Sequence, residues 1–415
     1  MAHVEAGTGK FRDIIVGVQL LFVAFGALVL VPLLTGLDPS IALLSAGVGT
    51  LIFQLVTKAR VPVFLASSFA FIAPIQIGIE TYGVAATLGG LATAGLLYLL
   101  LGGLVKLRGV QVIERYLPPV VTGPVIMVIG LSLAPTAIDM TRNFGSGSEI
   151  DYLAVLIALI TLTATIVVVL KGKGMLGYIP ILIGIIVGYI ISMLFGVVDY
   201  TPIHESQWFS LPWKGAIADG SYAFPVFDLR AILFILPVAI APAIEHVGDI
   251  LAISAVTKDD YLEDPGLHRT LTGDGLATTI GALLGGPPNT TYSEVTGAVA
   301  LLKTFRPVLM RIAAIAAILL AFFGKLGAVL KTTPVPVMGG IMVLLFGMIA
   351  VIGMQTLFRN KVDLSKSRNL VIIAVILVTG IGDLAFGFGD FSISGIGLAG
   401  VFGVMLNVIL PQQND

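Results

Sequence analysis

The sequence contains no cysteine and few charged residues. Among its 415 residues are four histidines and two tryptophans, and charged residues make up 11% of the chain. Without thiols, disulfide bonds and thiolate metal sites are excluded, and the scattered histidines give no metal-ligand spacing. With 57% hydrophobic residues and a mean hydropathy of +1.04, the chain cannot form the surface of a soluble domain. We therefore expect a membrane protein with no metal and no cofactor, and the net charge of −1 gives no support to nucleic-acid binding.

Signatures of nucleotide chemistry are also missing. The sequence has no phosphate-binding loop, no dinucleotide-binding context and no ATPase motif. It also lacks a nucleophile or metal constellation that would indicate an enzyme. We predict a protein that is not an enzyme and that draws any energy it needs from an ion gradient.

The chain consists instead of apolar stretches separated by short charged clusters. The stretches are about 17 to 25 residues long, which spans the hydrocarbon core of a bilayer as a helix. We predict an all-α polytopic membrane protein with fourteen transmembrane segments. The segments are expected at residues 13–34, 41–57, 62–80, 84–106, 117–136, 152–171, 176–196, 229–256, 270–286, 289–303, 307–328, 335–357, 367–384 and 393–411.

The basic residues predict how the chain is oriented. If the N-terminus is cytoplasmic, most of the 23 lysine and arginine residues fall in loops on the cytoplasmic side, as the positive-inside rule requires. If one predicted segment were missing or added, the basic loops after it would no longer fall on the cytoplasmic side. We predict a multi-pass protein of the cell membrane with both termini in the cytoplasm.

The predicted segments divide into two similar halves. The longest polar connection, residues 197–228, separates seven segments from seven, and an odd number makes the halves inverted repeats. In each half the third segment is interrupted, at residues 61–74 and at residues 286–294, where an extended proline-bounded stretch joins a helical one. Paired interruptions in inverted repeats are typical of transporter binding sites, because two half-helix N-termini meet near the midplane.

Two carboxylates lie in these apolar segments. Glu245 is inside the eighth segment, and Glu294 follows the broken run of residues 285–293. An acidic side chain is costly in hydrocarbon and usually faces a polar pathway, so the pair predicts a transporter. Two alternatives are that Glu245 is a structural carboxylate near the helix groups freed by Pro242, and that Glu294 is an acid stabilised by a helix dipole.

Several sequence runs resemble a known family. They are Phe69–Pro74, Glu245–Asp249, Asp264–Arg269, Pro288–Tyr292 and Pro336–Gly340. Together, and in this order, they are similar to the second nucleobase-cation symporter family, also called nucleobase-ascorbate transporters, and most of all to its bacterial uracil permeases. The resemblance extends over nearly the whole chain.

The resemblance implies a domain organisation. A core domain that holds the substrate would comprise residues 13–108 and 229–328, and a gate domain residues 117–196 and 335–411. It also implies short antiparallel strands in segments 3 and 10, proton-coupled uptake, and a homodimer formed through the gate domain.

The resemblance also assigns substrate-binding residues. Glu245 and Glu294 match the two carboxylates that hold a nucleobase, and Phe69 matches the aromatic residue that packs against it. The chemistry agrees, because carboxylates can accept from ring N–H groups while the backbone N–H groups of Phe69, Tyr292 and Ser293 donate to ring carbonyls. For Phe69, plain core packing is the alternative.

Proton coupling is expected from Glu245, His246 and Asp249. On a helix His246 points about 100° away from Glu245, which favours an indirect role, whereas Asp249 shares the face of Glu245 one turn away. Bacterial uracil permeases typically have histidine at the position of Asp249. Asp274 resembles an acid that purine-transporting relatives carry, or it is a surface acid at a helix end.

The sequence therefore predicts a secondary transporter that imports a nucleobase, most of all uracil, by proton symport with alternating access of the core domain against the gate domain. One alternative is a purine permease for xanthine. Another is an anion carrier of the related sulfate and bicarbonate transporter fold. Two carboxylates in the site oppose the last, because they repel anions. Two further departures, Val295 where asparagine is common and Leu302 where threonine is, bear on substrate selection.

Overall fold

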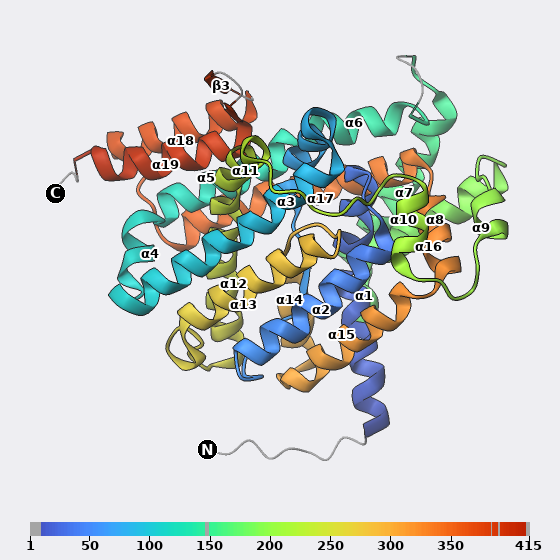
Figure 1. Cartoon of the computed structure of the whole chain (residues 1–415), viewed down its shortest axis with the longest axis horizontal. Coiled ribbons are helices and arrows are strands. Elements are labelled where there is room, and N and C mark those ends of the chain that lie inside the picture. The colour runs from blue at the N-terminus through green and yellow to red at the C-terminus, as the bar shows by residue number, and fades with distance from the viewer. Residues whose placement is uncertain (1–9, 146–148, 383, 389–390, 412–415) are drawn as a thin grey trace.

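The computed structural model describes residues 10–145, 149–382, 384–388 and 391–411. These residues are mostly helical, with few and short strands, as predicted. Within the described ranges, seven helices are long and apolar enough to cross a membrane, and four further apolar helices are shorter. The predicted total of fourteen segments and their inverted repeat remain predictions. Figure 1 shows the helices lying side by side in one body.

The first half of the chain contains most of the long helices. Its elements are α1 (Lys10–Thr35), α2 (Pro39–Val56), β1 (Leu65–Ser67), η1 (Phe69–Phe71), α3 (Ile72–Arg108), α4 (Gln111–Tyr116), α5 (Pro119–Ser132), α6 (Ala134–Arg142), α7 (Tyr152–Lys171), η2 (Gly174–Tyr178) and α8 (Pro180–Leu194). The predicted third and fourth segments belong to α3, which is bent at Gly83. Gly83 has φ +80°, a conformation that glycine adopts readily, so the predicted boundary lies at this kink.

The second half is more interrupted. Its elements are α9 (Thr201–Glu205), α10 (Pro212–Ala218), α11 (Leu229–Ile235), η3 (Leu236–Ala239), α12 (Ile240–Thr257), η4 (Leu262–Gly266), α13 (Leu267–Leu283), β2 (Asn289–Thr291), α14 (Ser293–Leu302), α15 (Pro307–Ala321), α16 (Gly324–Lys331), α17 (Val335–Arg359), α18 (Ser367–Ile381), β3 (Ala385–Phe388), β4 (Phe391–Ser394) and α19 (Gly395–Ile409). Proline at residues 237 and 242 interrupts hydrogen bonding around η3 and α12.

The helices pack in two groups. The first group consists of α1, α2, α3, α13 and α15, with α13 between α2 and α3. In the second, α17 packs against α5, α6 and α7, α7 packs against α8, and α18 and α19 pack against α5. Small residues permit the tightest contact in the first group, because a Cβ on Gly95 would lie 2.3 Å from the carbonyl oxygen of Gly275.

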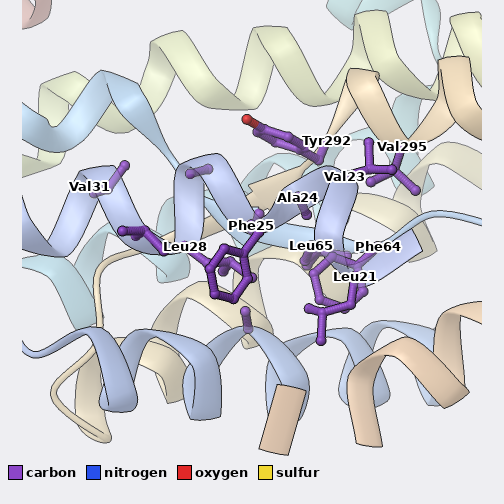
Figure 2. Close-up of a cluster of buried hydrophobic side chains, with 14 of the residues drawn as sticks. Leu21, Val23, Ala24, Phe25, Leu28, Val31, Phe64, Leu65, Tyr292 and Val295 are labelled. Carbon is purple, nitrogen blue, oxygen red and sulfur yellow. The ribbon is translucent and has the colours of Figure 1, made fainter. Parts of the chain in front are cut away.

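Helix α1 contributes many residues to one of the buried apolar clusters. Leu21, Ala24 and Leu28 of α1 are fully buried, and they pack in one cluster with Phe64 and Leu65 of the first interruption. Figure 2 shows these side chains close to Tyr292, within the second interruption, and to Val295, directly after it. The two interrupted segments are thus held against the same helix.

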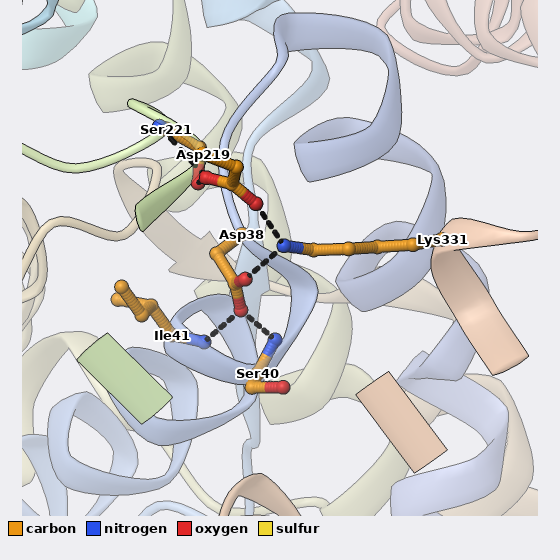
Figure 3. Close-up of polar contacts among 6 residues, drawn as sticks. All are labelled: Asp38, Ser40, Ile41, Asp219, Ser221 and Lys331. Atoms are coloured by element: carbon orange, nitrogen blue, oxygen red, sulfur yellow. Dashed lines mark hydrogen bonds and ion pairs between the residues drawn. The ribbon is translucent and has the colours of Figure 1, made fainter. Parts of the chain in front are cut away.

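The connection at residues 197–228 is packed onto the first group of helices. The indole Nε1 of Trp213 donates to the carbonyl of Leu284 at 2.7 Å, and Tyr222 fills the space beside Gly285. Lys331 bridges Asp219 in this connection and Asp38 at the start of α2, with N–O distances of 2.7 and 2.6 Å (Figure 3). This polar stretch is therefore an anchored part of the fold.

Candidate substrate site

The two interrupted segments meet as strands. Strand β1 pairs antiparallel with β2, with Leu65 opposite Thr291, Ala66 opposite Thr290 and Ser67 opposite Asn289. The predicted strands in segments 3 and 10 are confirmed. Because all six residues are buried, the ladder satisfies backbone groups that hydrocarbon would leave without partners.

Side chains of α2 hold the first strand. Thr50 accepts from the backbone N–H of Leu65 at 3.0 Å, and the amide of Gln54 donates to the carbonyl of Val61 at 2.8 Å. Both polar side chains are buried. They bind backbone that cannot pair within a helix, so they fix the position of β1.

The second strand is held from two helices. The side-chain amide of Asn289 donates to the carbonyl of Ser45 on α2 at 3.2 Å and to that of Ala277 on α13 at 3.3 Å. Thr278 of α13 donates to the carbonyl of Asn289 at 2.6 Å. Strand β2 is therefore fastened between α2 and α13.

A helix begins after each strand. Neither Ser68, which precedes η1, nor Tyr292, which precedes α14, makes a side-chain capping hydrogen bond. The first N–H groups of a helix have no partner within it, and they carry partial positive charge. Ser293 is the first residue of α14, and its predicted backbone role is compatible with this position; its side chain lies outside the described residues.

Phe69 connects the two packing groups. Its ring lies 6.5 Å from that of Tyr292, and also 6.5 Å, edge-on, from that of Phe346 on α17. Phe69 is half-buried, whereas Tyr292 is buried. One aromatic side chain from the strand region thus reaches the second helix group.

Glu294 faces a cavity between the groups. This cavity of about 60 Å³ is bounded by α1 and α14 on one side and by α7, α8 and α17 on the other. Glu294, in the first turn of α14, is the acidic residue of the lining, and Thr165 and Tyr178 are its residues with hydroxyl groups. The remaining lining includes Phe22, Val23, Ile181, Ile341 and Leu345.

Glu245 lies close to the other acids. It is half-buried on α12 and interacts electrostatically with Asp249, Glu294 and Asp274. The cavity, as lined by described residues, reaches Glu294 and not Glu245. The structure therefore brings the two predicted carboxylates into one acidic region, with one of them at the boundary between the helix groups.

His246 pairs with an acid from another helix. Its Nδ1 lies 3.2 Å from an oxygen of Asp274 on α13, and both side chains are fully buried. The ring also packs edge-on against Phe53, with centroids 6.3 Å apart. The alternative that Asp274 is a surface acid is wrong, because α13 begins seven residues earlier and is covered by α2 and α3.

Asp249 contacts the second strand. It accepts a hydrogen bond from Thr291 at 2.8 Å, and the same hydroxyl lies 3.4 Å from Nδ1 of His246. Asp249, His246 and Asp274 thus form a chain of polar groups behind β2, which links α12, β2 and α13.

Tyr98 was not foreseen from the sequence. Its ring is fully buried on α3, and it interacts electrostatically with Asp274 and Glu245. Among the described residues its hydroxyl has no hydrogen-bond partner. In the sequence, Tyr98 is one of several tyrosines and lies in a long apolar run, so nothing local sets it apart. Only the packing of α3 against α13 shows that it lies near Asp274 and Glu245.

The comparisons with known proteins decide the family. Residues 11–386 match the model of the "Permease family". This chain belongs to the nucleobase-ascorbate transporter family. It is 54% identical over 407 residues to the "Probable uracil permease" of Haemophilus influenzae, covering 98% of this chain and 96% of that protein. It is 45% identical to the "Uracil permease" of Bacillus caldolyticus and 38% identical to that of Escherichia coli, covering 96% of this chain and 92% and 91% of theirs.

Solved structures share the fold at low identity. The transmembrane domain of the cyanobacterial bicarbonate transporter BicA superposes with a TM-score of 0.66 at 15% identity, covering 95% of this chain and 96% of that one. Murine Solute Carrier 26 family member A9, an anion transporter, gives a TM-score of 0.69 at 11% identity, covering 98% of this chain and 69% of that one. The chain is thus a membrane permease of this transporter fold.

Proposed function

We propose that this permease imports uracil by proton symport. The observation that carries the proposal is the position of Glu294, at the free N-terminal end of α14 and in a cavity between the two helix groups. The relatives described above are named as uracil permeases, which favours the same substrate here.

The chemistry of the site suits a nucleobase. Uracil presents N–H donors beside carbonyl acceptors, so Glu294 and Glu245 accept from the ring while the backbone N–H groups of Phe69, Tyr292 and Ser293 donate to it. Phe69 packs against the base. We assign these five residues to substrate binding.

Alternating access would move the two helix groups against each other. The first group corresponds to the core domain, residues 13–108 and 229–328, and the second to the gate domain, residues 117–196 and 335–411. The walls of the cavity come from both groups, so relative motion of the groups opens or closes it. We place the homodimer contact on the gate domain and both termini in the cytoplasm.

The excess of acid supports proton coupling. Glu245, Asp249, Asp274 and Glu294 lie in one region with His246 as the nearby base. Carboxylates in a bilayer are stabilised by protonation or by pairing, so this region binds protons from one side and releases them to the other. We assign coupling to Glu245 with Asp249, and a supporting role to His246.

A purine permease for xanthine is the second candidate. The observation that favours it is the buried position of Asp274 next to the site, because this residue resembles an acid that purine-transporting relatives carry.

Uptake into proteoliposomes tests the proposal. Radiolabelled uracil, xanthine and bicarbonate are supplied in turn, with an inward proton gradient and no sodium. We expect accumulation of uracil, weaker uptake of xanthine and none of bicarbonate. If unlabelled xanthine competes with labelled uracil better than unlabelled uracil does, the assignment of uracil as the preferred substrate is wrong. If accumulation requires sodium and does not depend on the proton gradient, the assignment of proton symport is wrong.

A further inference from the structure

A second hollow lies away from the substrate site. It is a groove of about 500 Å³ on the outer side of α13, between the C-terminal part of α3 and the end of α2. The residues that define it are Val56, Leu99, Gly103, Lys106, His268 and Arg269. We call it the α3–α13 groove.

One end of the groove is basic. Lys106 belongs to the last turns of α3, and His268 and Arg269 belong to the first turn of α13. Burial, followed by the positive charges of Arg269 and Lys106, holds the pKa of His268 below its ordinary value, so the three side chains share one space. The start of α13 adds partial positive charge.

These charges lack an acidic partner within the described residues. Neither Lys106 nor Arg269 forms an ion pair there, and the groove lining contains no carboxylate. Arg269 is half-buried and donates to the carbonyl of Val56 at 3.3 Å, which holds its guanidinium at the groove. An anion placed there would interact with the positive charges of Lys106 and Arg269, and no carboxylate of the groove lining would compete with it.

The rest of the groove is mostly apolar, with Thr272 as the one polar residue of its described lining outside the basic end. Leu55 and Leu107 are about 80% exposed beside it, and Leu100 is 71% exposed on α3. In a membrane protein such leucines face acyl chains. A Cβ on Gly103 would meet no atom within 4 Å, so the groove continues along α3 without obstruction.

We infer that the α3–α13 groove binds an anionic phospholipid. The phosphodiester lies between Lys106, His268 and Arg269, and an acyl chain follows Leu99 and Gly103. A soluble phosphate would use the basic end but not the apolar wall. Basic pockets between transmembrane helices on the cytoplasmic side suit acidic head groups, and this groove is cytoplasmic in the orientation proposed above. The bound lipid braces α3 against α13, two helices of the proposed core domain.

Native mass spectrometry of the purified full chain tests this inference. Detergent-solubilised protein is titrated with dioleoyl phosphatidylglycerol or dioleoyl phosphatidylcholine. We expect the wild type to prefer the anionic lipid by at least about tenfold and the double variant Lys106→Gln/Arg269→Gln to lose that preference. The matched control Arg359→Gln/Lys361→Gln, which removes two exposed charges at the end of α17, should keep it.

A second variant separates the groove from charge alone. Gly103→Leu adds an apolar side chain in open space and leaves every basic residue in place, so it should also weaken lipid binding. Equal occupancy by the two lipids in the wild type, or an unchanged preference in both groove variants, would overturn the inference. If millimolar inorganic phosphate displaces phosphatidylglycerol, the occupant of the groove is a soluble anion, and the lipid proposal is wrong. Because uracil binding is measured separately, its loss would not affect this result.

Discussion

Two carboxylate clusters of this protein differ in how their charge is balanced. At the outer cluster, Lys331 bridges Asp38 and Asp219, and Asp38 also accepts from the backbone N–H groups of Ser40 and Ile41 (Figure 3). At the inner cluster, Glu245, Asp249, Asp274 and Glu294 lie around a single histidine.

The difference separates a structural anchor from the proposed substrate and proton site. The outer cluster supplies each carboxylate with a cation or with N–H donors, so it joins α2, α16 and the connection at residues 197–228. The inner cluster contains more acids than bases and adjoins the cavity at Glu294. Acidic groups in a membrane are stabilised by protons, by a ligand or by pairing, and the proposed proton symport would use the first two.

The largest expected effect is at the inner cluster. Glu245→Gln should abolish concentrative uracil uptake, because a neutral amide cannot take up and release a proton. The measurement is accumulation in proteoliposomes under an imposed proton gradient, with exchange of internal and external uracil measured in parallel. Wild-type accumulation by this variant would leave Glu245 as a substrate ligand only.

Glu294→Gln should weaken uracil binding about ten- to a hundredfold and leave the fold intact. The amide presents an NH₂ group to a ring N–H, and losing a charge-assisted hydrogen bond costs ~1.5–3 kcal/mol. Calorimetry of the purified protein measures the change. The control is Glu205→Gln on the exposed surface of α9, which should bind like the wild type. Unchanged affinity for Glu294→Gln would remove this residue from the site.

The sequence predicts the inner cluster only in part. Apolar length and polar breaks predict the helices and both interruptions, because these are local properties of the chain. The resemblance identifies Glu245 and Glu294, and helical spacing alone places Asp249 on the face of Glu245. It does not predict that His246 meets Asp274, since that contact depends on how α12 and α13 pack, and Tyr98 joins the region only through the close approach of Gly95 and Gly275.

The outer cluster shows the same limit. The sequence identifies residues 197–228 as a polar connection, but the links of Trp213 to Leu284 and of Asp219 to Lys331 join positions about 70 and 110 residues apart. No local pattern encodes such a pair. The polar character of the segment was predictable, and its attachment to the first helix group was not.

Removing the cation should destabilise the outer cluster. Lys331→Met leaves Asp38, whose side chain is 4% exposed, without its counter-ion. A buried unpaired charge is costly, but Lys331 itself is 31% exposed, so we expect a loss of about 1–2 kcal/mol in unfolding free energy. Thermal unfolding in detergent measures it, with the exposed Lys214→Met as the control. An unchanged melting temperature would show that Asp38 is satisfied by its backbone donors alone.

The smallest expected effect is at Asp219. Burial alone would raise the pKa of this carboxyl, but hydrogen bonds from Lys331 and Ser221 outweigh it and hold the pKa below its ordinary value. A lowered folded-state pKa stabilises the fold at neutral pH, and that contribution is lost as pH falls below about 4.

Asp219→Asn should therefore lower the free energy of unfolding by only about 0.2–1 kcal/mol at neutral pH, since the side chain is 46% exposed. The variant should lose no further stability in acid. Hydrogen–deuterium exchange of residues 213–226 checks this at about pH 7 and about pH 3.5. The wild-type segment should exchange faster, after correction for the intrinsic rate, at the lower pH, and the variant should show the same protection at both. Asp363→Asn, which changes a carboxyl with a similarly lowered pKa in another loop, should leave the pH response of this segment unchanged. If Asp219→Asn keeps the wild-type pH response, the connection at residues 197–228 is held by Trp213 and Tyr222. The ion pair between Asp219 and Lys331 then contributes nothing measurable.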